Sequence, residues 1–559
     1  MTKILAFLFI FLYLIPFMTA LCCFFPKLRH VCFACMVYFT SNDKSINICP
    51  DPNWTGSAFG FAFTAVSLFG LPLLLSMIFS FRFKIRIFPP GSFFYFLYYL
   101  AILISGVNAE YMIPWGFEVC KMFWMYITFL TVFNYLNNCK DISFLFYVVN
   151  SVIMILLIVG FDQKYRLGGF QIASTFPHQN SLSLYLELFG LLTLGVLMNE
   201  RMGRILFLFT MAAFCGSVLL IIFTYSRGGL VVYFGGIAIV CALSILFNGF
   251  SIRRLLLMLV GLIILLCIMG YALPRIILRF TKAPEASKNT RIEFALAAKM
   301  MANDHRLGVG ANNYSVHSAE YWNRVKEDPV EHGGIVETVY LLVAAECGWW
   351  GLGVMLLWFL YYYFSVTISM FSLRKMPCSG IAIGIFAGLT CNYWHSTLEW
   401  SLKQTNNFAG LMIIYALTGV IAVNRKNIKA AYRKRMAREG LTPQKKKKRR
   451  VYRPVMPTPP DFDLRALRKG LEPAPADGPA FASAEETAIT AAQTGEIAPA
   501  KAAETQASAT MEEFEIAPAE APAPDTPAAP QEESAPAPDT PASDTPAPDT
   551  PAPDTPPAE

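Results

Sequence analysis

The residues of this chain that could do chemistry lie at the ends of long apolar segments. Three of them, Arg166, Arg227 and Arg291, are arginines. They suit a phosphate or diphosphate, because the guanidinium fork binds phosphate oxygens bidentately. Histidines and glutamates lie near them, and either side chain can take a proton from an incoming hydroxyl. The further candidate residues are His178, Asn180, His332 and Glu337.

No known catalytic or metal-binding spacing accompanies these residues. The chain shows no metal-ligand spacing, no GxSxG nucleophile motif and no P-loop. We therefore expect neither a metal nor a cofactor in the site.

Arg227 ends a long apolar run in the segment Ser226-Arg227-Gly228-Gly229. An arginine at such a place can snorkel to the membrane interface and have no further role. The turn is very short, however, and its glycines allow helices to approach closely. A charge held at this depth usually faces a polar cavity, so a functional role is the favoured interpretation.

The segment around Arg291 predicts a helix. Thr290 and Glu293 have the spacing of a capping box, and apolar residues recur at helical spacing over 292–300. Arg291 would then lie in the first turn, where free N–H groups and the helix dipole favour an anion. Taken alone, the segment fits an ordinary surface arginine on an amphipathic helix better.

The elements that must position these residues are membrane helices. The chain is 55% hydrophobic and only 15% charged, whereas a soluble domain averages about 25% charged. Its apolar runs approach the ~20 residues that cross a bilayer, and they are too uniform for barrel strands. We predict an all-α, polytopic membrane protein with about twelve transmembrane helices. The predicted spans are 4–24, 57–80, 92–108, 117–136, 142–161, 181–199, 205–224, 229–247, 255–274, 338–369, 380–396 and 405–423.

The distribution of Lys and Arg predicts the orientation of these spans. With the N-terminus inside, every cytoplasmic connection is basic, and both termini are cytoplasmic. The opposite face then receives four polar segments, which include a large periplasmic loop. All the candidate site residues fall within these segments, which are 162–180, 226–229, about 275–337 and 395–404.

Composition divides the chain into three parts. Residues 1–424 form the predicted transmembrane domain. Residues 425–470 are a basic juxtamembrane segment, which we expect to sit against anionic membrane lipids rather than nucleic acid, since it lacks interleaved aromatics. Residues 471–559 are a Pro/Ala/acidic low-complexity tail, which we expect to be disordered because it cannot bury enough apolar surface to fold.

The order of the motifs resembles the O-antigen ligase and polymerase superfamily. That family's pattern contains Arg-x-x-Gly-x-Phe and Pro-Asn, then Ser-Arg-Gly at a span end, then a periplasmic helix led by Arg. A His-Pro-Leu-x-Gly-x-Gly-like turn, His-Asn-x-Tyr-Leu and Glu-x-Gly-x-x-Gly follow. The resemblance covers roughly residues 160–425. The matching residues are Arg166 to Asn180, Ser226-Arg227-Gly228, Arg291, His305 to Asn313, Tyr340-Leu341, Glu346, Gly348 and Gly351.

The chain departs from this pattern at two places. Pro177 is separated from Asn180 by two residues, and the position of the family's catalytic histidine holds Glu337, followed by Thr338. The nearest histidine is His332, five residues upstream. Three alternatives follow. Glu337 replaces the histidine as the base, His332 takes the place of that histidine in the folded chain, or the activity is altered or lost.

The resemblance implies an inverting, metal-independent glycosyl transfer at the periplasmic face of the bacterial inner membrane. The donor would be a glycan on undecaprenyl diphosphate, and the acceptor a hydroxyl of a glycan, of lipid A–core or of a protein. Arg227 and Arg291, with Arg166, would neutralise the leaving diphosphate. His332 or Glu337 would be the base, and His178 and Asn180 would contact other parts of the substrate.

Within this reading, ligase, polymerase and protein O-oligosaccharyltransferase remain alternatives. A transporter or flippase for a lipid-linked or anionic solute is the rival from another class. A transporter should show internal repeats and helices broken near the midplane. The sequence shows no clear repeat, and its polar residues lie at span ends.

Overall fold

The computed structural model describes residues 2–42, 44–51, 54–80, 83–138, 142–281, 285–325 and 334–439. Of these residues 78% are helical and very few are in strands, which confirms the all-α prediction. Two short strands, β1 (Ser45–Ile48) and β2 (Phe61–Thr64), pair antiparallel as a hairpin. The predicted tail, 471–559, lies outside the described residues, as does most of the basic segment before it.

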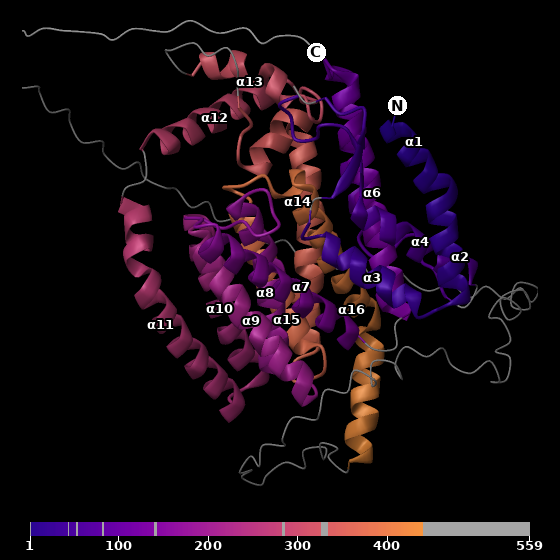
Figure 1. The fold of residues 1–559 in the computed structure, drawn as a ribbon, viewed down its shortest axis with the longest axis vertical. Helices are drawn as coiled ribbons and strands as arrows, with labels where there is room; N and C mark the ends of the chain where they lie inside the picture. The colour runs from indigo at the N-terminus through magenta and orange to yellow at the C-terminus, as the bar shows by residue number, and fades with distance from the viewer. Residues whose placement is uncertain are drawn as a thin grey trace, which may run out of the picture. The chain divides into compact units, whose positions relative to one another are not determined.

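The helices follow the predicted apolar runs (Figure 1). They are α1 (Thr2–Phe9), α2 (Ile15–Phe24), α3 (Leu28–Phe39), α4 (Ala65–Phe79), α5 (Ser92–Ser105), α6 (Met112–Asn138), α7 (Ser143–Phe161), α8 (Gln179–Asn199), α9 (Arg204–Thr224), α10 (Arg227–Asn248), α11 (Ile252–Thr281), α12 (Glu285–Asp304), α13 (Tyr314–Asn323), α14 (Val339–Ser372), α15 (Ser379–His395) and α16 (Thr405–Arg438).

Eight helices in the described part of the chain are long and apolar enough to cross a membrane. The chain is therefore a multi-pass membrane protein. The other four predicted spans coincide with α4, α5, α11 and α15, and the total of twelve stays a prediction.

The helices and strands differ from the predicted boundaries at four places. Residues 61–64 of the span predicted at 57–80 form β2, because they pair with β1, and the Thr64 hydroxyl then caps α4 by accepting from Ser67 N at 3.3 Å. The helices α11 and α16 run beyond the predicted ends at 274 and 423, to Thr281 and Arg438. Finally, Thr290 lies inside α12, since good helix formers such as Glu285 and Ala286 precede it.

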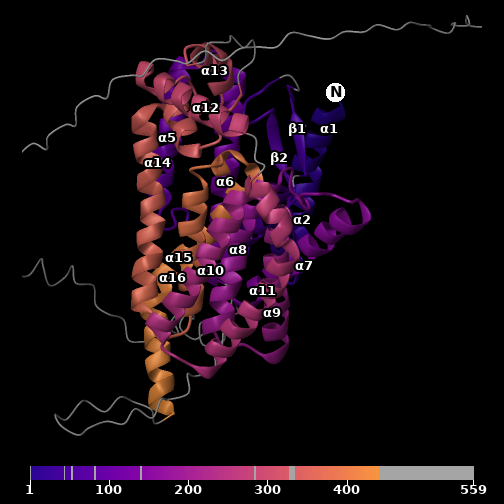
Figure 2. The ribbon, with the colours of Figure 1, turned by 90° about the vertical axis from the view of Figure 1, so that its left-hand side faces the viewer.

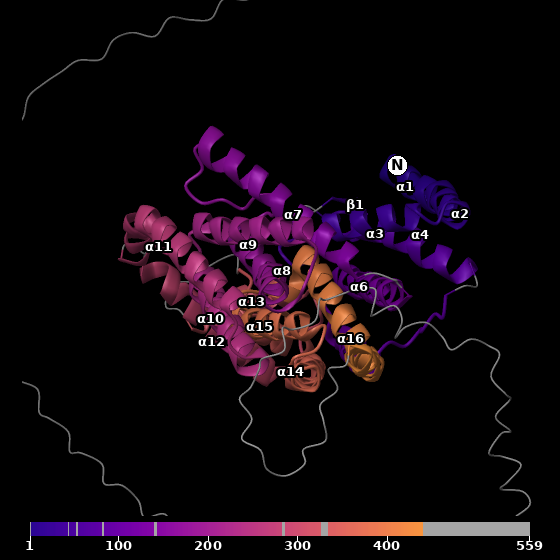
Figure 3. The same ribbon diagram turned by 90° about the horizontal axis from the view of Figure 1, so that it is seen from below.

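The helix α8 is the centre of the bundle. Its residues from Ser181 to Met198 are all buried, and it packs against α9, α10 and α15 (Figure 3). The contact with α15 is close because glycines meet there: a Cβ on Gly195 would lie 2.4 Å from the Gly380 oxygen. Small residues permit such backbone approach between membrane helices.

The helices α12 and α13 lie beyond one end of the bundle and pack against the start of α14 (Figure 2). Thus the predicted loop at 275–337 is largely helical. The turn that contains Gly310 holds α12 and α13 against α14. Val309 N and Gly310 N donate to the Ala345 and Glu346 carbonyls, both at 3.0 Å, beside a non-helical break in α14 at Gly348. The turn does not line the cavity described below, and its role is to dock α12 and α13 on α14.

Candidate functional site

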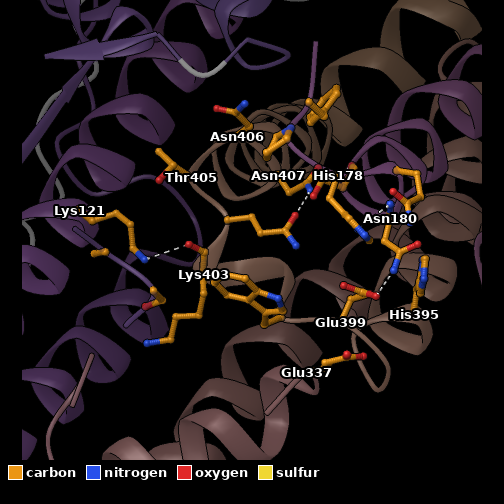
Figure 4. Close-up of a pocket in the computed structure, with 18 of the residues that line it drawn as sticks. Lys121, His178, Asn180, Glu337, His395, Glu399, Lys403, Thr405, Asn406 and Asn407 are labelled. Carbon is orange, nitrogen blue, oxygen red and sulfur yellow. Dashed lines mark hydrogen bonds between the residues drawn. The ribbon is translucent and has the colours of Figure 1, made fainter. Parts of the chain in front are cut away.

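A polar cavity of about 700 Å³ opens at the α12 end of the bundle. Its wall combines the hairpin, the first turns of three helices, residues of α6 and α12, and the turn between α15 and α16 (Figure 4). These segments are far apart in the sequence. The cavity therefore exists only in the folded chain.

Five of the predicted site residues line this one cavity. They come from the starts of α8 and α10, from α12 and from the residues before α14: His178, Asn180, Arg227, Arg291 and Glu337. The structure thus brings the two arginines and a carboxylate together.

Two other predicted site residues are not in this group. The Arg166 side chain is 72% exposed, is bonded to Asp162 four residues earlier, and does not line the cavity. The expectation that it shares the diphosphate site therefore does not fit its position. His332 lies outside the described residues.

Three helices direct their N-termini at the cavity. The lining includes Gln179–Ser181 of α8, Arg227 and Gly228 of α10, and Thr405–Asn407 of α16. Unpaired N–H groups at a helix N-terminus, together with the helix dipole, favour a bound anion. The termini of α8 and α10, which carry Asn180 and Arg227, create an electropositive environment that suits a diphosphate, whereas the start of α16 at Thr405 lies on the side of Lys121.

Arg227 is held at the first position of α10 by a tight connection. Tyr225 takes a left-handed conformation with φ 46°, and the Ser226 side chain caps α10 by accepting from Gly229 N at 3.2 Å. No residue in the described part of the chain hydrogen-bonds the Arg227 guanidinium. This half-buried cation is therefore free to bind a ligand.

Arg291 and Glu337 form an ion pair across the mouth of the cavity. Arg291 Nη2 lies 2.5 Å from Glu337 Oε2, and both side chains are about two-fifths exposed, at 41% and 38%. Burial raises the pKa of Glu337, and the charge of Arg291 opposes that rise. An anion that binds Arg291 would compete with this carboxylate. The carboxylate would then be free to accept a proton.

Three further ionisable groups, which were not among the predicted site residues, lie beside the cavity: His395 at the end of α15, Glu399 in the turn after it, and Glu187 of α8. His395 Nδ1 lies 2.6 Å from Glu187 Oε1, and both side chains are almost fully buried. Asn180 Nδ2 donates to Glu399, and burial raises the pKa of Glu399 to about 7. The available signal was Glu187, a single acid in the apolar run of α8, because a charge inside a span usually has a function or a partner.

A fully buried cluster of four charges forms part of the cavity floor. Lys121 Nζ contacts Glu118 Oε2 at 2.7 Å, while Lys403 Nζ contacts Glu118 Oε1 at 3.2 Å and also pairs with Glu346. The cluster joins α6, α14 and the turn before α16. Two lysines and two glutamates leave it neutral overall, so it ties these elements together without adding net charge to the cavity.

We predict that Lys403→Met destabilises the protein by about 3–5 kcal/mol, because it leaves Glu346 buried without a partner. Denaturant unfolding in detergent measures this change. Lys299→Met, at an exposed position of α12, is the matched control and should have little effect. The double variant Lys403→Met with Glu346→Leu should regain part of the loss. Equal stabilities of Lys403→Met and Lys299→Met would contradict the assignment.

Comparison with known proteins gives one match and one negative result. Residues 206–357 match the family model described as O-antigen ligase. The matched segment contains Arg227, Arg291 and Glu337, whereas Asn180 and the turn after α15 lie outside it. A search of curated proteins found no match. The family match supports a resemblance to the O-antigen ligase superfamily, and the two arginines that share one cavity lie within the matched residues.

Proposed function

We propose that the protein is an O-antigen ligase-like glycosyltransferase that moves a glycan from undecaprenyl diphosphate to an acceptor hydroxyl. The observation that carries this proposal is the meeting of Arg227, Arg291 and Glu337 in one cavity. Two guanidinium groups and the N-termini of α8 and α10 suit the diphosphate of the donor. The carboxylate beside Arg291 suits the deprotonation of an acceptor.

The transfer follows from these positions. The acceptor oxygen attacks the anomeric carbon from the face opposite the diphosphate, and the bond from that carbon to the diphosphate oxygen breaks. The acceptor proton passes to Glu337, and the configuration at the anomeric carbon inverts. Arg227 and Arg291 stabilise the charge that develops on the leaving diphosphate, which removes the need for a metal.

The ion pair couples donor binding to base activation. Before the donor binds, Glu337 is held by Arg291 at 2.5 Å. The diphosphate then binds Arg291 in place of Glu337, and Glu337 becomes free to accept a proton. His332 is the alternative base, and His178 and Asn180 contact the sugars next to the reacting bond.

The direct test is transfer by the purified protein. Undecaprenyl-diphosphate-linked glycan is supplied with lipid A–core, and formation of the joined product is measured. Surface-glycan profiles of a deletion strain then separate the three acceptor types. Loss of glycan from the core indicates a ligase, capping with a single repeat unit indicates a polymerase, and unchanged profiles favour a protein or another acceptor.

We also propose that the cavity faces the periplasm, that the protein sits in the inner membrane, and that both termini are cytoplasmic. Reporter fusions after Arg204 and Lys375 should then read as cytoplasmic, and fusions within 285–325 as periplasmic, because the basic connections stay inside. A fusion in the α5–α6 connection, at Asn108, is the internal control and should match those in 285–325. A periplasmic signal at Lys375 would overturn this orientation.

A further inference from the structure

The cavity has a second end, away from the arginines. Figure 4 shows Lys121 and Thr405 on one side of the cavity, and His178, Asn180, His395 and Glu399 on the other. The wall of the second end comes from the hairpin and from α6, both outside the family-matched residues 206–357. The side chains that line this end include Ser45, Asn47, Thr64, Phe117 and Trp124.

Two amide oxygens in this cavity have no hydrogen-bond donor. Asn47 Oδ1 and Asn407 Oδ1 are buried and unpartnered among the described residues. The orientation of the Asn407 amide is fixed, because its Nδ2 donates to Ser181 O at 3.1 Å and to Gln404 Oε1 at 2.6 Å. Buried polar atoms in native proteins nearly always have a partner. These two oxygens can therefore accept from a donor, such as a hydroxyl group, that enters the cavity.

Among the residues that the structure describes, the second end offers no free charge to a ligand. Its lysine, Lys121, lies 2.7 Å from Glu118 and also donates to the Lys403 carbonyl at 3.3 Å. The remaining wall is made of hydroxyls, amides and aromatic rings. Trp124 is held in place by Phe63 of β2, edge to face, with ring centroids 5.0 Å apart. An apolar wall with a few convergent polar groups is typical of a small-ligand site.

The hairpin wall is attached to the family-matched segment by one side chain. Asn312 Oδ1 accepts from Ala58 N at 3.0 Å, and its Nδ2 donates to Ala58 O and Pro114 O, both at 2.9 Å. Asn312 is itself fully buried. The position of the second end is thus fixed relative to Arg291 and Glu337.

We propose that this second end binds the acceptor, and that the acceptor is an uncharged saccharide. Sugar hydroxyls would donate to Asn47 and Asn407, and the apolar face of a sugar ring would rest on Trp124. The attacking hydroxyl would then point along the cavity toward Glu337. This inference rests on the proposed transferase function and narrows its acceptor.

The test uses the full-length protein in nanodiscs and two kinds of ligand. Undecaprenyl diphosphate probes the arginine end. Neutral hexose oligosaccharides probe the second end, with uronic-acid oligosaccharides of the same length and a Ser/Thr-rich peptide as competitors. The variants are Asn47→Leu and Asn407→Leu, which keep the volume and remove the amide. Asn150→Leu in α7 is the matched control, since Asn150 is also buried with an unpartnered Oδ1 but lies outside the cavity.

We expect each cavity variant to weaken neutral oligosaccharide binding by roughly 3–10-fold, the effect of losing one hydrogen bond. Their affinity for undecaprenyl diphosphate should stay that of wild type, and Asn150→Leu should leave both affinities unchanged. If neutral oligosaccharides do not bind, if the peptide or the uronic acids bind better, or if both cavity variants behave as wild type, this proposal is overturned. Failure of the proposed function would look different. Undecaprenyl diphosphate would not bind at all, or the Arg227→Lys and Arg291→Lys variants would bind it as tightly as the wild-type protein does.

Discussion

Arg227→Lys and Arg291→Lys should each reduce glycan transfer by about 10²–10³-fold, the usual loss when one charge-stabilising donor is removed from a reaction centre. Lysine keeps the positive charge but loses the bidentate fork that matches phosphate oxygens. Initial rates with purified protein, lipid-linked donor and a saturating acceptor measure the loss. Membrane insertion should be normal in both variants, because Arg227 has no bonded partner among the described residues and a lysine at 291 keeps the charge that faces Glu337.

The matched control for this experiment is Arg166→Lys. Arg166 is an arginine at the same end of the bundle, but it is exposed and bonded to Asp162 outside the cavity. Its substitution should leave transfer nearly unchanged. Wild-type rates in both cavity variants would remove the diphosphate role from these arginines, and a general loss in all three would point to damaged folding instead.

Replacement of Glu337 by Gln should lower the transfer rate by about 10²–10⁴-fold, the contribution of a general base. The amide keeps the shape of the side chain but cannot accept the acceptor proton. Donor affinity should be retained or improved, because the diphosphate no longer competes with a carboxylate for Arg291. Single-turnover rates and the Kd of undecaprenyl diphosphate separate these two effects.

The pH dependence gives a second readout for Glu337. Burial raises its pKa above the ordinary value for a glutamate. A base works only when deprotonated, so wild-type activity should fall as the pH drops through that raised pKa. The Glu337→Gln variant should lose this acid limb. His332→Ala should cause only a mild loss, and the reverse ranking of the two variants would assign the base to His332.

The sequence by itself determined the class of the protein and predicted an anionic ligand for its arginines. Apolar runs near the length of a bilayer must be helices, because lipid offers no partner for backbone groups, and the structure has helices at these runs. Basic connections predicted which segments share a face. Arg227, Arg291 and Glu337, chosen for residue type and position, do line one cavity.

Motif-based reasoning failed where residues outside the motif, even nearby ones, decide the local structure. Thr290 has the spacing of a cap, but the helix begins earlier, because the preceding residues also favour helix. The strand at 61–64 looked like the start of a span until its pairing with 45–48 was known. Arg166 has the right chemistry, yet its ion pair with Asp162 keeps it away from the cavity.

Only the tertiary structure decided the rest of the site. Glu187 and His395 are 208 residues apart in the chain, and Lys403 lies 285 residues from Glu118, so no periodicity or motif connects either pair. Helix packing brings them into contact, and burial then makes each charge depend on its partner. The uncharged end of the cavity likewise arises because the hairpin docks on Asn312. Hydropathy depends on neighbours in sequence, whereas a cavity depends on neighbours in space, and this is why the sequence predicted the arginine end but not the second end.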